Sequence, residues 1–218
     1  WWRWLACRCA IMASCTTVQR LFARATVGLV PKTYLPNYGR VLRRRHFVPG
    51  PKDAFEITFA GQRTLFGTNL LFACREMPEF VLGVEICEDL WAPVPPSCSH
   101  ALAGATVVAN LSASDETVGK AAYRRELVAG QSARLLCGYV YADAGHGEST
   151  TDMTFAAHNL IAENGTLLCE AELSPTVPLQ PSWTLAAWCR SVSATRPLCR
   201  MPPDTRPSAL IWKWQKHR

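Results

Sequence analysis

Acidic residues are missing from long stretches of this chain. No Asp or Glu precedes Asp53, and Asp204 is the only acid after residue 173. Residues 1–29 and 174–218 are therefore basic, whereas residues 30–173 hold sixteen acids against twelve Lys or Arg. The formal net charge of +6 thus comes from the two flanks. A nucleic-acid-binding domain gathers its basic residues on the folded domain itself, so this distribution excludes nucleic acid as the partner.

The chain also lacks the features of a secreted or membrane protein. No apolar run is long enough to cross a membrane, and the apolar start Trp1–Ile11 is interrupted by Arg3 and Arg8. The ten cysteines lack the spacing of a disulfide scaffold, and Cys7 and Cys9 are too close together for a zinc site. We therefore expect a cytoplasmic protein with reduced thiols, no membrane partner and no metal site.

One cysteine lies where a nucleophile would be presented. The apolar run Phe80–Ile86 predicts a strand that is buried on both faces, and it ends at Cys87. A strand that ends on a cysteine exposes the thiol at the sheet edge, on a rigid element. A lone cysteine at a strand end is more often a small buried hydrophobe, so Cys87 needs support from other residues.

Two further segments provide that support. Lys32 lies in Val30–Tyr38, which contains Pro31 and Pro36, and alone it would be read as a solvated surface charge. Asn110–Glu116 follows another short apolar run and brings an amide and hydroxyls to the next strand end. Ligand groups gather at the carboxyl ends of neighbouring strands in an open α/β sheet. The three segments together predict a cysteine amidase that uses a lysine.

The rest of the middle region predicts alternating strands and helices. The amphipathic stretch Thr117–Leu136 predicts a helix with a break near Gly130, and Asn164-Gly165 predicts a hairpin turn. Gly67–Arg75 fits a strand or a short helix. The other expected elements are strands at Phe55–Phe59, Gln62–Leu65, Thr106–Asn110 and Tyr139–Ala142, and a short helix at Ser99–Ala103.

Four motifs resemble a known family. They read PKTYLPNY, GVEICEDLW, NLSASDETVGKAAYRRELV and GYVYADAGHGESTTDMTF, in this order between Val30 and Leu173. They resemble the glutamine-hydrolysing domain of glutamine-dependent NAD+ synthetases, which belongs to the nitrilase (carbon–nitrogen hydrolase) superfamily. The resemblance implies an α/β fold of the α-β-β-α sandwich type, incomplete here at the N-terminus.

The resemblance also implies the chemistry. Glutamine amide hydrolysis would supply ammonia for the ATP-dependent conversion of deamido-NAD+ to NAD+. Cys87 would be the nucleophile that forms a γ-glutamyl thioester, and Lys32 would stabilise the thiolate and the tetrahedral intermediate. Two alternatives remain open: a free-standing amidase of the same superfamily, or a non-functional gene fragment.

Binding residues and partners follow from the same resemblance. It implies that glutamine is bound by Tyr38, Glu88, Ser112, Ser114, Arg124 and Arg125. A solvated helix face is an equal alternative for Arg124 and Arg125. No cofactor is expected in this region, since ATP, Mg and deamido-NAD+ would bind a synthetase domain that this chain does not show. The intact family is expected to form homo-oligomers.

The resemblance fails at three places, which are the segment before Val30, Arg40–Arg43 and the tail after Leu173. The family's general base is a glutamate upstream of the lysine, but no acid precedes Asp53, and Arg40–Arg43 stands where the family has a stretch like Glu-Phe-Tyr-Glu. Shifted reading frames can restore family-like sequence near each failure. We therefore expect three regions: an aberrant or frameshifted segment at 1–29, a partial glutaminase domain at 30–173, and a non-globular, out-of-frame tail at 174–218. A chain of this kind would have little or no activity.

Overall fold

A computed structural model describes most of the middle region and parts of the flanks. The backbone is described for residues 4–11, 14–22, 26–38, 41–42, 47–145, 154–171 and 208–212, and side chains for 28–37, 47–145 and 154–171. The side chain of Tyr38, the side chains of residues 1–27 and most of residues 174–218 lie outside these ranges. The three expected regions therefore stay predictions.

Strands and helices alternate through the described chain, as an α/β fold requires. The strands are β1 (Trp4–Ile11), β2 (Ser14–Phe22), β3 (Thr26–Pro31), β4 (Asn37–Tyr38), β5 (Val41–Leu42), β6 (Phe55–Phe59), β7 (Gln62–Phe66), β8 (Leu70–Cys74), β9 (Val81–Ile86), β10 (Val107–Ser112), β11 (Gly138–Asp143), β12 (Leu160–Glu163), β13 (Thr166–Glu170) and β14 (Ser208–Trp212). The helices are the 3-10 helix η2 (Cys87–Trp91), α1 (Pro96–Leu102) and α2 (Lys120–Leu135).

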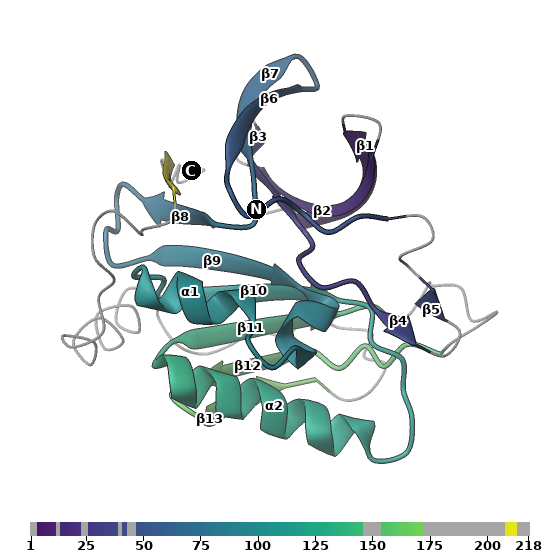
Figure 1. The fold of residues 1–218 in the computed structure, drawn as a ribbon. Coiled ribbons are helices and arrows are strands. Elements are labelled where there is room, and N and C mark those ends of the chain that lie inside the picture. Colours follow the sequence, from purple (N-terminus) through teal and green to yellow (C-terminus); the bar gives the residue numbers. More distant parts are fainter. Residues whose placement is uncertain are drawn as a thin grey trace, which may run out of the picture.

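A seven-stranded sheet forms the body of the molecule, with the strand order β13-β12-β11-β10-β9-β8-β14. Its centre is parallel, since β10 pairs in parallel with both β9 and β11, whereas β8, β12 and β13 join in antiparallel pairs. Helices α1 and α2 lie over one face of this sheet (Figure 1). Parallel strands need cover on both faces, which explains the unbroken apolar run of β9.

A second sheet has the strand order β1-β2-β3-β7-β6. In Figure 1 it rises from the edge of the larger sheet near β8 and β9. Both α-helices in the described ranges cover the seven-stranded sheet, so a helical layer over the smaller sheet is not seen in that part of the chain. The described residues thus include both sheets of the expected sandwich and one of its two groups of helices.

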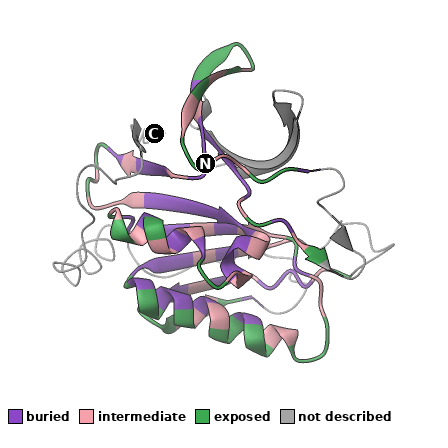
Figure 2. Ribbon diagram, in the orientation of Figure 1, coloured by how far each residue is buried: buried purple, intermediate pink, exposed green. Residues whose placement is uncertain are grey.

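The core follows the larger sheet (Figure 2). Phe72, Val84, Val108, Tyr139 and other apolar residues of its strands form one buried cluster. α1 packs closely on β9, because a Cβ added at Gly83 would lie 2.9 Å from the Cβ of His100. This close approach sets the height of α1 above the strand that ends at Cys87.

Most expected elements are present, with three corrections. α2 runs through Gly130 without a break, because tertiary packing of Val128, Gln131 and Leu135 holds the helix where propensity alone is weak. α1 begins at Pro96 rather than Ser99, since proline suits the first turn of a helix.

The third correction is that the strand at Thr106–Asn110 is shifted to Val107–Ser112. The ambiguous Gly67–Arg75 stretch contains the strand β8. The predicted Asn-Gly hairpin is confirmed, with φ of 46° at Asn164 and 84° at Gly165.

Two observations concern the flanks and the membrane. Ser208–Trp212, in the stretch expected to be non-globular, pairs in parallel with β8 at the edge of the larger sheet. Among the described residues, no helix is both long enough and apolar enough to span a membrane.

Candidate active site

The carboxyl ends of β9, β10 and β11 meet at one edge of the sheet. The register pairs Glu85 with Asn110, Asn110 with Tyr141, and Ser112 with Asp143. Cys87 directly follows β9 and has a φ of +49°, a left-handed conformation that is unusual for a residue other than glycine. The chain then turns at once into η2. Cys87 therefore lies on a strand-to-helix turn, at the strand end where the sequence predicted it, and its role as a nucleophile stays a prediction.

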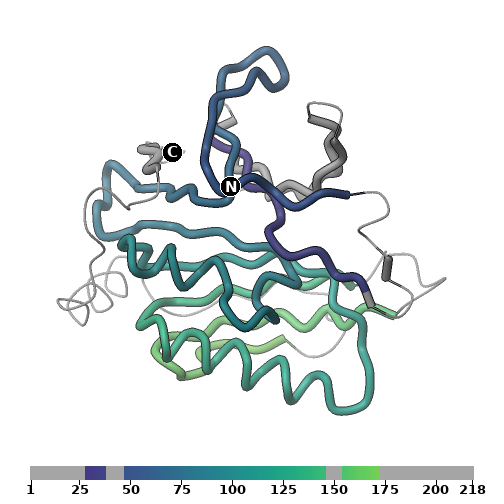
Figure 3. The backbone as a smooth tube through the Cα atoms, viewed as in Figure 1, coloured from purple at the N-terminus to yellow at the C-terminus, as the bar shows by residue number. Residues whose placement is uncertain are grey.

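Lys32 comes to this edge from the segment after β3. Figure 3 shows residues 28–38 passing beside the ends of β9 and β10. Although Lys32 carries a charge, its side chain is only 4% exposed, and its Nζ donates a hydrogen bond to the carbonyl oxygen of Ile86. The structure therefore places the predicted lysine one residue from the predicted nucleophile, and not on the solvated surface.

Asp89 ties the two segments together. Its Oδ1 accepts hydrogen bonds from the backbone N–H groups of Tyr34 (2.7 Å) and Thr33 (3.2 Å). Its Oδ2 accepts one from the N–H of Ile86 at 2.9 Å. Burial raises the pKa of Asp89, while the charge of Lys32 and these N–H donors oppose that rise. Asp89 is thus a buried clamp between the lysine segment and the end of β9, a role that sequence reasoning did not assign.

Asn110 holds the turn from the neighbouring strand. Its Oδ1 accepts the backbone N–H of Cys87 at 2.8 Å and the Oγ–H of Ser112 at 2.9 Å. Ser112, one of the predicted binding residues, therefore lies close to the nucleophile. The sequence signal for Asn110 was an amide at the end of an otherwise apolar run, which is costly to bury without partners.

Other predicted binding residues lie further along the same edge. Ser114 is buried, and its backbone N–H donates to Oδ1 of Asp143 at 2.8 Å. Glu88 is half-buried on η2, next to Cys87. Tyr38 belongs to β4, but its side chain lies outside the described residues.

Arg124 and Arg125 behave differently although they are adjacent. Arg124 is fully buried and donates hydrogen bonds to Nδ1 of His158 (2.8 Å), Oγ of Ser114 (3.1 Å) and Oε2 of Glu116 (3.1 Å). Arg125 is nearly half exposed and pairs with Glu170 on β13. A solvated helix face therefore describes Arg125 but is wrong for Arg124, which joins α2 to the segment after β10.

Tyr141 and Asp143 extend the site on β11, and sequence reasoning missed both. Burial raises the pKa of Asp143 to about 6, against the opposing effects of the Ser114 N–H and the Arg124 charge. Burial likewise raises the pKa of Tyr141, and the nearby charges of Asp143 and Cys87 add to that rise. Their only sequence signal was the alternating Tyr-Ala-Asp pattern of the strand.

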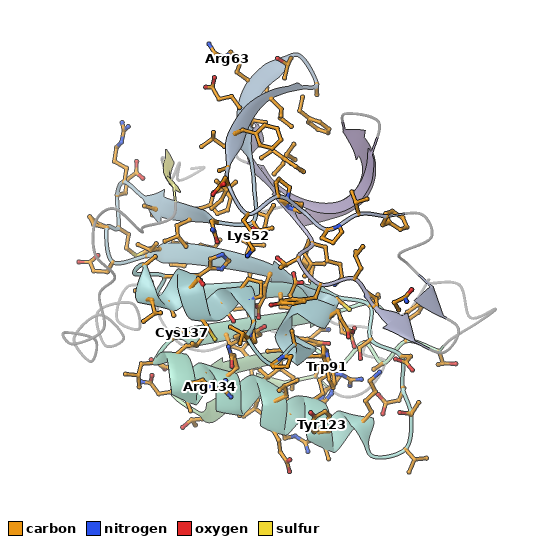
Figure 4. All side chains as sticks on the ribbon, viewed as in Figure 1. Lys52, Arg63, Trp91, Tyr123, Arg134 and Cys137 are labelled. Atoms are coloured by element: carbon orange, nitrogen blue, oxygen red, sulfur yellow. The ribbon has the colours of Figure 1, made fainter. Side chains whose placement is uncertain are left out.

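Aromatic packing joins η2 to α2. The rings of Trp91 on η2 and Tyr123 on α2 lie 5.3 Å apart between centroids (Figure 4), and Nζ of Lys120 lies 5.5 Å from the Trp91 centroid. These contacts join the last residue of η2 to α2.

The clamp at Asp89 makes a stability prediction. Asp89→Asn keeps one acceptor oxygen, so either the Tyr34 or the Ile86 N–H must face an NH2 group inside the protein. We expect a loss of about 3 kcal/mol in the free energy of unfolding, measured by chemical denaturation. Asp115→Asn, at a partly exposed ion pair with Lys120, is the matched control and should cost less than about 1 kcal/mol. Equal losses for the two variants would contradict the clamp.

The chain matches relatives over much of its length, although no family model matches it. It is 52% identical over 151 residues to the glutamine-dependent NAD(+) synthetase of Mycobacterium tuberculosis, which covers 69% of this chain and 22% of that protein. The Mycobacterium leprae protein of the same name is 50% identical over 149 residues, covering 68% and 22%. The chain thus spans less than a quarter of the length of these relatives.

Solved structures agree with the sequence relatives. A glutamine-dependent NAD(+) synthetase from Cytophaga hutchinsonii superposes with a TM-score of 0.68 and 29% identity, over 78% of this chain and 27% of that one. A carbon–nitrogen hydrolase from Helicobacter pylori gives a TM-score of 0.59 at 15% identity, over 78% and 57%, which is a likeness of fold alone. The chain therefore belongs to the family of glutamine-dependent NAD+ synthetases and has the fold of the nitrilase superfamily.

Proposed function

We propose that this chain carries the glutamine-hydrolysing chemistry of its family, with Cys87 as the nucleophile. The observation that supports the proposal most is the left-handed turn at Cys87 with the buried Lys32 ammonium on the adjacent carbonyl of Ile86. A positive charge one residue from Cys87 would stabilise the negative charge that develops on the substrate oxygen during attack.

The proposed reaction has two steps. Sγ of Cys87 attacks the side-chain amide carbon of glutamine, forming a C–S bond and an oxyanion next to the Lys32 charge. Collapse of this intermediate breaks the C–N bond, and the nitrogen takes up a proton and leaves as ammonia. Water then attacks the γ-glutamyl thioester, which releases glutamate and returns the thiol.

Glutamine would be held by polar groups at the same edge. Ser112 is the best supported, because it shares the acceptor oxygen of Asn110 with the Cys87 N–H. Glu88 and Tyr38 lie next to the nucleophile and the lysine in sequence. Arg124 would act by positioning Ser114, since its guanidinium is fully buried and already bonded to that hydroxyl. Binding roles for Arg124 and Arg125 thus have less support than one for Ser112.

The ammonia would serve NAD+ formation. The names of the relatives describe enzymes that make NAD+ and depend on glutamine. We therefore assign ATP, Mg and deamido-NAD+ to a synthetase part of the family that lies outside the matched region. We also propose this synthetase part as the protein partner of the chain. The intact protein would form a homo-oligomer.

The proposed reaction also needs a group that carries protons. Both steps need a base and acid near the nitrogen and the water. The family's base precedes the lysine, and no Asp or Glu precedes Asp53 here. We therefore expect residues 1–218 on their own to have low activity, because no carboxylate among them precedes Lys32.

Selective labelling tests the nucleophile without needing turnover. Brief treatment with a glutamine-like diazoketone, followed by mass mapping, should label Cys87 before the other free cysteines of the middle region, which are Cys74, Cys98, Cys137 and Cys169. Lys32→Met should slow this labelling by roughly 10²-fold, because the thiolate and the developing oxyanion lose their positive charge.

Lys52→Met is the matched control, since Lys52 is exposed and should leave the rate unchanged. Earlier labelling of Cys98 or Cys137, or equal rates for the two lysine variants, would contradict the assignment.

Ammonia release tests the missing base. The test compares residues 1–218 with a version that carries the family's segment upstream of Lys32 and Glu-Phe-Tyr-Glu in place of Arg40–Arg43. We expect residues 1–218 to hydrolyse glutamine roughly 10²–10⁴-fold more slowly than this restored version. Cys87→Ala in the restored version should abolish the difference. Equal and substantial activity of the two versions would show that another residue serves as the base.

A further inference from the structure

A chain of buried hydrogen bonds runs from helix α1 to the backbone of Cys87. The N–H of Ser97 donates to Oε2 of Glu85 at 2.9 Å, and the hydroxyl of Tyr139 donates to Oε1 of Glu85. The Nδ2 of Asn110 donates to the Tyr139 oxygen at 3.1 Å, and Oδ1 of Asn110 accepts the Cys87 N–H at 2.8 Å. The three linking side chains are each no more than 1% exposed. No step of the proposed reaction uses Glu85 or Tyr139.

The donors and acceptors in this chain of hydrogen bonds follow one order, which the charge of Glu85 determines. An ionised carboxylate can only accept, so the single hydrogen of the Tyr139 hydroxyl must point at Glu85. The Tyr139 oxygen then accepts, which obliges Asn110 to turn its NH2 toward Tyr139. Only in that orientation does Oδ1 of Asn110 face the N–H of Cys87.

We propose that Glu85 is a positioning residue for Cys87: through Tyr139 it fixes the amide orientation of Asn110, and so keeps the Cys87 N–H bonded on its left-handed turn. The inference deepens the proposed function, because it names the group that positions the proposed nucleophile. A neutral Glu85 that carries its hydrogen on Oε1 allows this chain of hydrogen bonds to reverse. It would donate to Tyr139, Tyr139 would donate to Asn110, and the NH2 of Asn110 would then oppose the Cys87 N–H.

Within this chain of hydrogen bonds, Glu85 is the group whose pKa lies near neutral pH. Burial raises its pKa from 4.5 to about 7, against the opposing hydrogen bonds from Tyr139 and Ser97. From η2, the negative charge of Asp89 adds to the rise. On α1, burial lowers the pKa of His100 to about 4, so that His100 stays neutral, and Cys98 is the other titratable group. Burial also raises the pKa of Tyr139, which keeps its hydrogen.

Amide hydrogen exchange of Cys87, followed by NMR on the full chain, tests the proposal directly. Protection of the Cys87 N–H should fall roughly tenfold as pH is lowered through about 7, once corrected for the intrinsic exchange rate. Global stability should change in the opposite sense. A carboxyl with a raised pKa holds its proton more tightly when folded, so its contribution is present below 4.5 and lost as pH rises through about 7. A purely structural role would make local protection follow global stability.

Two variants and a matched control separate the links. Glu85→Gln mimics the neutral carboxyl, so the Cys87 N–H should exchange roughly tenfold faster at every pH, without the step near 7. Tyr139→Phe should give the same loss by removing the linking hydroxyl. Thr106→Val also removes one buried hydroxyl, just before the start of β10, where the hydroxyl donates to the carbonyl oxygen of Glu79 at 2.7 Å. It should change Cys87 protection only as far as it changes global stability.

The outcomes decide between this inference and the proposed function. Cys87 protection that tracks global stability in the wild type and all variants would overturn the positioning role of Glu85. The pH step needs no variant, so it decides the matter even if Glu85→Gln fails to fold. If the step and the variant effects appear but the diazoketone labels another cysteine first, the positioning of Cys87 stands and the proposed glutaminase role fails.

Discussion

The left-handed turn at Cys87 is the constraint on which the rest of the site depends. A residue with a side chain adopts a φ of +49° only where its surroundings hold it there. Here the backbone groups around the turn leave the sheet ladder and bond to side chains from three different segments. Asp89 accepts a hydrogen bond from the N–H of Ile86, and Lys32 donates one to the carbonyl oxygen of Ile86. Asn110 accepts one from the N–H of Cys87. The turn ends β9, starts η2 and exposes the thiol to the edge where the parallel strands finish.

The same site buries an unusual amount of charge. Lys32, Glu85, Asp89 and Arg124 are each at most 4% exposed. Removing a charge from water is costly, and the structure offsets the cost by giving every one of them hydrogen-bonded partners. Such groups make a site rigid, because losing any partner leaves a charge without compensation in the interior. Burial raises the pKa values of Glu85 and Asp143 toward neutrality, against the opposing effect of the hydrogen bonds that each accepts.

The sequence predicted most of the strands between residues 55 and 170. It also singled out Cys87 and Lys32, which the structure brings to the same sheet edge, while their catalytic roles stay predictions. The period of apolar residues predicted β6, β9 and the β12–β13 hairpin, because these elements depend on local pattern and turn chemistry. The roles of Asp89, Asn110 and Tyr139 were missed, since their partners come from strands and loops that lie far apart in the chain. Strand alternation also carries no information past Cys87, where the positive φ ends the extended backbone.

One pair of variants tests the central claim about the turn. Cys87→Gly and Cys87→Ala both remove the thiol, but only glycine adopts a positive φ without steric cost. The account predicts that Cys87→Gly is more stable than Cys87→Ala by about 1 kcal/mol in chemical denaturation. The order should reverse at Ala109, within β10, where Ala109→Gly should cost about 1 kcal/mol. A Cys87→Ala protein as stable as Cys87→Gly would mean that residue 87 is not held in a left-handed turn, and would contradict the account.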